Sequence, residues 1–179
     1  MSIALYRKYR PATFDDVIGQ DVIVRVLREA ARRGTLAHAY LLAGPRGTGK
    51  TTTARLIAKI ANCERRNAEA SFRERGEPCN ECRSCREIEE GRNLDVVEID
   101  AASNRGIDEI RNLKESVRLA PLSLLAKVFI IDEAHQLTKD AWNALLKTLE
   151  EPPPAVHFIL ATTEADRIPA TITSRTQQF

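Results

Sequence analysis

Four short apolar runs alternate with longer segments of helical periodicity along this chain. Each run is apolar through its middle, which is typical of the central strands of a parallel sheet that are buried on both faces. The predicted strands are residues 39–43, 95–99, 127–132 and 156–161. A fifth is indicated at residues 172–179, which resemble a turn that leads into a strand.

Between the strands, apolar residues recur at the three- and four-residue spacing of amphipathic helices. The first predicted helix carries this pattern from Ile23 to Ala30, and Gly34 is expected to end it. Further helices are predicted at residues 52–62, 107–118 and 139–150. Strand and helix thus alternate, which predicts an α/β fold with a parallel, doubly wound sheet flanked by helices.

Residues 63–92 interrupt this alternation with a polar, charged stretch that contains all four cysteines. The 179 residues are 43% hydrophobic and carry a net charge of +2, which suits one domain with a small appendage and does not itself indicate a nucleic-acid binder. The start, MSIALYRKYRP, lacks the apolar core of a signal peptide. No apolar run has the length of a membrane span, so we expect a cytoplasmic protein without membrane contact.

The segment GPRGTGKT, residues 44–51, matches the phosphate-binding loop and stands between a predicted strand and a predicted helix. Its glycines let backbone N–H groups face phosphate oxygens, and the helix start adds a positive dipole end. Lys50 is expected to reach the β- and γ-phosphates of ATP, and the Thr51 hydroxyl to bind Mg²⁺. The plainer alternative is a glycine-rich turn that matches by chance. The residues expected to contact nucleotide are Gly44, Pro45, Arg46, Gly47, Thr48, Gly49, Lys50, Thr51 and Thr52.

A second acidic motif, VFIIDE, ends the strand predicted at residues 127–132. Asp132 is expected to hold Mg²⁺, and Glu133 to orient or deprotonate the attacking water. Two acids at a strand end can also cap the next helix. A protein that only binds nucleotide would not need Glu133, so the pair favours hydrolysis.

The four cysteines, Cys63, Cys79, Cys82 and Cys85, form overlapping C-x₂-C units with a fourth thiol upstream. Four soft thiolates suit a tetrahedral Zn²⁺ without an open position. A redox pair would need only two of them, and an iron–sulfur cluster is compatible with the same ligands. The interleaved arginines and glutamates around them favour a solvated face or a protein contact over nucleic-acid binding.

In their order, the motifs YRPATFDDVIGQ, GPRGTGKT, CNECRSC, VVEIDAAS, IDEAH, NALLKTLEEPP, ILATT and TSRT resemble the ATPase subunits (gamma/tau) of bacterial DNA polymerase III clamp loaders. The resemblance covers essentially the whole chain. It implies an AAA+ base domain over residues 1–179, with a five-stranded sheet and a zinc-binding insertion at 63–92. It also implies a heteropentamer with other clamp-loader subunits that loads the sliding clamp onto primed DNA. Lid and collar domains are then expected beyond Phe179.

The resemblance also implies roles for individual residues. Thr163 matches the sensor that contacts the γ-phosphate or the attacking water. Arg175 matches the arginine finger of a neighbour's ATP site, although the family's Ser-Arg-Cys is Ser-Arg-Thr here. Arg105 is expected to contact DNA phosphates. The adenine-side wall is matched by Arg10, Pro11, Val17 and Ile18.

Each of these roles has a plainer alternative. Thr163 can simply cap a strand, Arg175 can form a surface ion pair, and the wall residues can serve as packing. A scaffold subunit that does not hydrolyse ATP usually lacks the phosphate loop that this chain retains. A helicase, suggested by Asp132-Glu-Ala-His135, needs a second domain, so His135 is interpreted as part of a turn. We expect loss of the metal to loosen residues 63–92 and to spare the ATP site.

Overall fold

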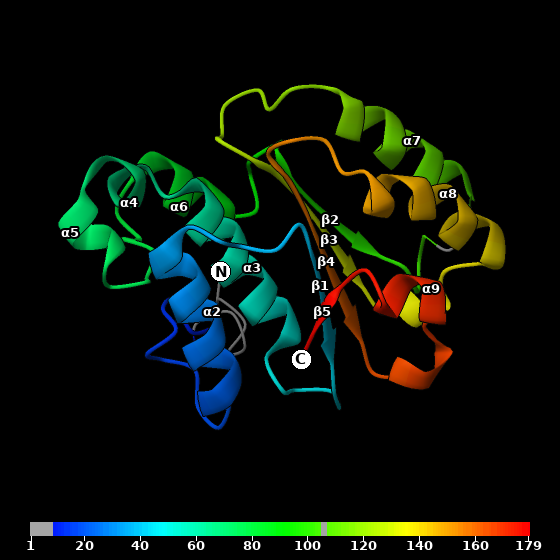
Figure 1. Ribbon diagram of the computed structural model, residues 1–179, viewed down its shortest axis with the longest axis horizontal. Coiled ribbons are helices and arrows are strands. Elements are labelled where there is room, and N and C mark those ends of the chain that lie inside the picture. The colour runs from blue at the N-terminus through cyan, green and yellow to red at the C-terminus, as the bar shows by residue number, and fades with distance from the viewer. Residues whose placement is uncertain (1–8, 105–106) are drawn as a thin grey trace, which may run out of the picture.

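The computed structural model describes residues 9–104 and 107–179, and within them five parallel strands form one central sheet (Figure 1). The spatial order is β2-β3-β4-β1-β5. The predicted α/β fold with a parallel five-stranded sheet is therefore confirmed. The strands are β1 (Ala39–Ala43), β2 (Val96–Asp100), β3 (Lys127–Asp132), β4 (Val156–Thr162) and β5 (Gln177–Gln178).

The helices lie on both faces of this sheet (Figure 1). The four long helices correspond to those predicted, and α2 ends at Gly34 as expected. Among the described residues, no helix is long and apolar enough to span a membrane. The helices are α2 (Asp21–Arg33), α3 (Lys50–Asn62), α4 (Glu64–Ala68), α5 (Ala70–Arg73), α6 (Arg83–Glu89), α7 (Ile107–Arg118), α8 (Lys139–Glu150) and α9 (Ala170–Thr173), with the 3₁₀ turns η1 (Ala134–Gln136) and η2 (Ala165–Arg167).

The two faces of the sheet belong to two hydrophobic cores. Alternate strand residues point to opposite faces, so Leu41 and Phe129 pack with α7 and α8 whereas Tyr40 and Val128 pack with α2 and α3. Phe129 also stacks on Phe158 of β4. Burial on both faces explains why β1, β3 and β4 are apolar through their middles, whereas the two outer strands β2 and β5 are less buried and carry polar residues.

Residues 63–92, which we call the cysteine module, form the three short helices α4, α5 and α6 beside α2 and α3 (Figure 1). Ile88 is buried in the core that α2 and α3 share. Arg66 and Glu77 are buried as well. These two residues are therefore not part of the solvated face or protein contact expected for the charged side chains of this stretch, because both make hydrogen bonds to neighbouring elements.

Asp95, predicted as the first residue of a strand, lies just before β2 and has a different task. It is fully buried, and its carboxylate accepts hydrogen bonds from the backbone N–H groups of Leu122, Ser123 and Leu124 at 2.8–3.0 Å. Burial raises the pKa of Asp95, but these hydrogen bonds outweigh it and hold the pKa below its ordinary value. One carboxylate thus anchors the loop between α7 and β3.

We predict that Asp95→Ala lowers the free energy of unfolding by about 2–4 kcal/mol, because three partly buried N–H groups lose their acceptor. Urea denaturation at pH 7 measures the change. Asp16→Ala is the control, because its carboxylate accepts N–H groups in an exposed turn. The contribution of Asp95 is present above the pKa of an unfolded aspartate and is lost as pH falls through the lower folded pKa. Equal losses in both variants would contradict this account.

Candidate nucleotide and metal sites

The loop between β1 and α3 has the backbone of an anion-binding site. Gly47 and Gly49 have φ values of 83° and 87°, a left-handed conformation that glycine adopts without steric cost. Helix α3 begins directly afterwards, at Lys50, and no side chain caps its first turn. The N–H groups of that turn, with the positive end of the helix dipole, are therefore placed to bind phosphate oxygens.

The ammonium group of Lys50 lies over this loop. Its Nζ donates to the carbonyl oxygens of Gly44 at 2.7 Å and Pro45 at 2.8 Å, and Thr48 Oγ1 donates to the same Pro45 oxygen at 2.9 Å. These contacts hold the lysine against the loop and use two of its three N–H groups, which leaves the third for a phosphate oxygen.

Thr51 and Asp132 meet across 81 residues of sequence. The Thr51 hydroxyl donates to Asp132 Oδ2 at 2.7 Å, which joins the first turn of α3 to the end of β3. Asp132 Oδ1 accepts the N–H of Glu133 at 2.9 Å. A hydroxyl beside a carboxylate at the end of a phosphate loop is a fitting oxygen donor set for Mg²⁺.

Glu133 sits directly after β3 in a left-handed conformation, with φ 48° and ψ 44°. Such a conformation costs free energy in a residue other than glycine, and it is found at functional sites more often than elsewhere. Glu133 Oε2 accepts a hydrogen bond from Thr163 Oγ1 at 3.0 Å, and Arg46 Nε lies 3.8 Å from Oε1. The predicted water-activating and sensor residues are thus in direct contact.

His135 lies in the turn η1, as expected, but its contacts extend beyond that turn. Its side chain is 3% exposed, with Nδ1 3.0 Å from Thr162 Oγ1 and Nε2 3.0 Å from Glu164 Oε1. Nδ1 is also 3.5 Å from Glu133 Oε2. The imidazole therefore connects the ends of β3 and β4 behind Glu133, an arrangement that nothing in the sequence pattern indicated.

Two cavities open beside the phosphate loop. One, of about 360 Å³, is lined by Arg10 together with loop residues and the acidic pair Asp132 and Glu133. The other, of about 140 Å³, is lined by Gln20, Ile23 and Phe179 and by the other side of the loop.

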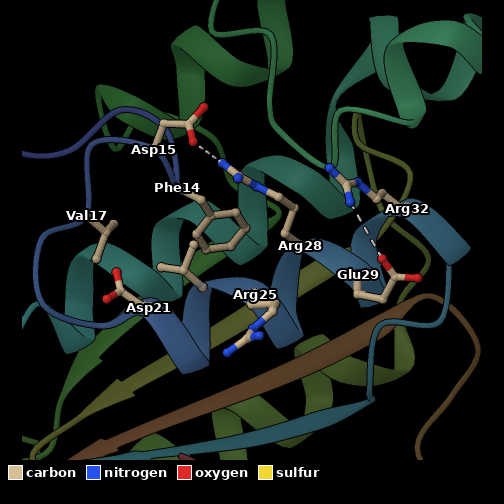
Figure 2. Close-up of a pocket in the computed structure, with 9 residues that line it drawn as sticks. Phe14, Asp15, Val17, Asp21, Arg25, Arg28, Glu29 and Arg32 are labelled. Atoms are coloured by element: carbon tan, nitrogen blue, oxygen red, sulfur yellow. Dashed lines mark hydrogen bonds and ion pairs between the residues drawn. The ribbon is translucent and has the colours of Figure 1, made fainter.

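The four residues matched to an adenine wall do not gather around one cavity. Arg10 lines the phosphate side instead, and Ile18 is 94% exposed. Val17 borders a third cavity of about 420 Å³ beside α2, together with Phe14 and Asp21 (Figure 2). Pro11 is half-buried and borders none of these three cavities. The smaller cavity is bordered instead by Gln20, which ends the matched segment YRPATFDDVIGQ, and by Ile23 and Phe179, to which the sequence interpretation gave no part in the wall.

Arg175 lies at the opposite end of the strands from the phosphate loop. Gln177 of β5 pairs with Tyr40 near the start of β1, whereas the loop follows the end of β1 at Ala43. Arg175 precedes β5, and its Nη2 forms an ion pair with Glu150 at 2.5 Å. Three strand residues span about 10 Å, so Arg175 does not reach the phosphate loop of its own chain.

The predicted DNA contact Arg105 falls outside the described residues. The turn before it is well defined, because the Asp100 carboxylate accepts the Ala102 N–H and the Ser103 hydroxyl, each at 2.9 Å. This turn follows β2, at the same sheet edge as the end of β3.

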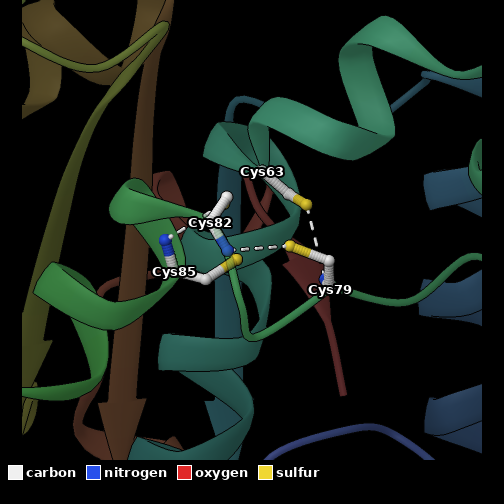
Figure 3. Close-up of side chains that lie close together, drawn as sticks. All are labelled: Cys63, Cys79, Cys82 and Cys85. Carbon is white, nitrogen blue, oxygen red and sulfur yellow. Dashed lines mark hydrogen bonds between the residues drawn. The ribbon is translucent and has the colours of Figure 1, made fainter.

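The four cysteines form one cluster at the junction of α3 and α6 (Figure 3). Their sulfur atoms all lie within 4.8 Å of one another. Backbone N–H groups also point at the sulfurs: Cys79 Sγ accepts from Cys82 at 3.3 Å, and Cys63 Sγ accepts from Cys79 at 3.4 Å. Four convergent sulfur donors with such support fit one soft, tetrahedral metal ion.

The thiols of this cluster differ in pKa. A hydrogen bond from the Cys85 thiol lowers the pKa of Cys63 to about 5, with backbone N–H groups of Arg66 and Cys79 adding to the effect. The same hydrogen bond, together with burial, raises the pKa of Cys85. A cation would relieve this competition by stabilising all four thiolates.

Comparison with known proteins decides the family. A family model described as DNA polymerase III, delta subunit, matches residues 19–179. The chain belongs to this family. Among its relatives, the DNA polymerase III subunit tau of Bacillus subtilis is 53% identical over 176 residues, which are 98% of this chain and 30% of that protein. The subunit tau of Escherichia coli is 48% identical over 175 residues, 98% of this chain and 26% of that protein.

This chain of the DNA polymerase III family thus spans less than a third of these relatives' own length. The resemblance to gamma/tau subunits is confirmed by these identities. Among solved structures, the RuvB Holliday junction branch migration motor of Thermotoga maritima is similar to this chain, with a TM-score of 0.60 and 26% sequence identity. The match covers 95% of this chain and 47% of the RuvB chain. A DNA polymerase III gamma subunit-related protein from the same organism, at a TM-score of 0.53 and 23% identity over 89% of this chain and 44% of that one, supports the fold alone. The predicted AAA+ fold is therefore confirmed.

Proposed function

We propose that this chain binds and hydrolyses ATP with Mg²⁺ as the motor part of a DNA polymerase III clamp loader. The observation that carries the proposal is that three sets of contacts lie together at the carboxyl ends of the strands. Lys50 lies over the loop, Thr51 is hydrogen-bonded to Asp132, and Thr163 is hydrogen-bonded to Glu133. They come from the ends of β1, β3 and β4, which are neighbours in the sheet.

The geometry supports the following roles for these residues. Lys50 and the first-turn N–H groups of α3 hold the phosphates, and Thr51 and Asp132 hold the metal ion. Mg²⁺ supplies charge neutralisation on the phosphate oxygens. Glu133 accepts a proton from the attacking water or orients it, and Thr163 keeps that carboxylate in place. A scaffold subunit that does not hydrolyse ATP is the alternative, but it has no use for a carboxylate held in this way.

We further propose that the chain works in the cytoplasm within a heteropentamer of clamp-loader subunits, which loads the sliding clamp onto primed DNA. The similarity to tau subunits over nearly the whole chain supports this proposal. In this arrangement residues 1–179 are the AAA+ base domain, the lid and collar domains follow it, and Arg105 faces the DNA. Arg175 acts on the ATP site of a neighbouring subunit, because the phosphate loop of its own chain lies at the other end of the strands.

We also propose that the cysteine cluster holds one structural Zn²⁺. The four sulfurs leave no open position for a catalytic water, and redox use would leave two of them idle.

Lys50→Ala should abolish useful nucleotide affinity, since it removes the cation that faces the phosphates. Glu133→Gln should leave binding intact and stop hydrolysis in the assembled complex, since only the group that acts on water is changed. Titration with a fluorescent ATP analogue and a phosphate-release assay measure the two effects. Equal loss of binding in both variants would refute the role of Glu133.

Arg175→Ala should spare nucleotide binding but reduce DNA-stimulated hydrolysis of the assembled complex by about 10³–10⁵, the effect of an arginine finger acting in trans. Glu150→Gln is the matched control, because it breaks the ion pair and keeps the guanidinium group. If Arg175 serves only that ion pair, both variants will behave alike. The 179-residue chain alone should hydrolyse ATP slowly, because no neighbour supplies an arginine to its site. Rapid ATP hydrolysis at low protein concentration would show that Arg175 is dispensable.

Metal analysis of the purified chain should give one zinc per chain, and Cys63→Ser should reduce it, because one of four ligands is lost. Elemental analysis by mass spectrometry distinguishes zinc from iron. Clearly less than one zinc per chain, or iron in its place, would contradict the assignment.

A further inference from the structure

The cysteine module is hydrogen-bonded to residues 10–17, which we call the leading segment. Asn80 Nδ2 donates to the carbonyl oxygen of Ala12 at 2.9 Å. Glu77 Oε2 accepts the backbone N–H of Phe14 at 2.8 Å, and the Glu77 residue is only 8% exposed. Phe14 itself is 1% exposed and packs in the core beneath α2.

The position of Asn80 depends on the cluster. It lies between Cys79 and Cys82 in a left-handed conformation with φ 58°. The two residues after Asn80, Glu81 and Cys82, donate their backbone N–H groups to Cys79 Sγ. Asn80 Oδ1 also accepts a hydrogen bond from Lys59 Nζ at 3.0 Å. Lys59 is a buried residue of α3, the helix that begins at the phosphate loop. Asn80 therefore joins three parts: the cluster, α3 and the leading segment.

A second set of contacts fixes the same region against α2. Gly76 lies so close to this helix that a Cβ atom would come within 2.7 Å of the Arg28 carbonyl oxygen. Glu77 forms an ion pair with Arg28, and the same guanidinium group lies 2.5 Å from Asp15 of the leading segment (Figure 2). The module and the leading segment are thus joined through a shared arginine as well as directly.

The leading segment also reaches the phosphate side of the nucleotide cavity. Arg10 lines that cavity with Lys50, Asp132 and Glu133. Ala12 lies two residues further on, and two residues span at most about 7 Å. The hydrogen bond at the Ala12 carbonyl therefore lies within two residues of a side chain that borders the phosphate cavity.

We propose that the cysteine module is a brace for the nucleotide site, with Asn80 and Glu77 as positioning residues that hold the leading segment and keep Arg10 at the phosphate cavity. The inference rests on the nucleotide site proposed above. It leads to the opposite prediction from the expectation that loss of the metal spares that site, since hydrogen bonds from the module reach the segment that borders it.

Two substitutions of Asn80 separate its contacts. Asn80→Gly suits the left-handed backbone and removes both side-chain hydrogen bonds. Asn80→Asp keeps an acceptor for Lys59 but cannot donate to the Ala12 carbonyl. Glu81→Ala is the matched control, because the Glu81 side chain is 76% exposed and its ion pair with Arg65, at 3.8 Å, lies within the module.

With zinc content unchanged, both Asn80 variants should bind a fluorescent ADP analogue about three- to tenfold more weakly than the parent chain, the effect of one or two lost hydrogen bonds. Hydrogen exchange at residues 12–17 should become faster in both. The Glu81→Ala chain should match the parent in both measurements. Affinity equal to that of the parent in both Asn80 variants would overturn the inference and leave the proposed function standing. A parent chain that fails to bind nucleotide would refute the proposed function itself.

Metal removal gives an independent test. Removal of the thiolate-bound metal with a chelator, followed by removal of the chelator and return of Mg²⁺ before titration, should weaken nucleotide binding by the parent chain. The same treatment should have a smaller effect on Asn80→Gly, because its hydrogen bond to the leading segment is already absent. If an Asn80 variant loses its metal, the chelated parent chain decides the question. Unchanged affinity after metal removal would overturn the inference.

Discussion

The parallel pairing of β4 with both β1 and β3 is the constraint on which the site depends. In this register Ala43 is opposite Thr162, and Ile131 is opposite Leu160, so the phosphate loop and the acidic pair emerge at the same edge. A slip of one residue would move each strand end by about 3.3 Å and turn its side chains to the wrong face. The 2.7 Å hydrogen bond between Thr51 and Asp132 would not survive that shift.

The fold and the centre of the site could be predicted because their signals are local. An apolar run marks a strand wherever it pairs, and the loop of residues 44–51 requires its own glycines whatever surrounds it. The cysteine spacing likewise predicted a cluster, which the convergence of four sulfurs confirms. The position of Asp95 was missed because an aspartate before a strand resembles any other polar boundary, and its partners lie beyond the next helix.

The remainder of the site depends on contacts between residues far apart in sequence. Glu77 reaches Phe14 across 63 residues, and Asn80 reaches Ala12 across 68. Glu77 belongs to no motif, and Asn80 is one of the residues between the cysteines of CNECRSC, whose spacing does not specify its side-chain partners. The cysteine module is attached to the core largely through such polar groups, with Lys59 and Arg66 buried at its border with α2 and α3. A buried charge needs its partners in place, so this attachment specifies one arrangement more strictly than apolar packing alone.

The action proposed for Arg175, on the ATP site of a neighbouring subunit, has a consequence for assembly. Such a subunit would give its arginine to one neighbour and receive an arginine at its own ATP site from the other neighbour. Because the two groups lie at opposite ends of the strands, the subunits would associate head to tail, through two different surfaces. In an open arc of such subunits, one terminal subunit holds an ATP site that no neighbour completes. The subunit at the other end holds an arginine that serves no site. Subunits of the same fold would therefore differ in function according to their position in the arc.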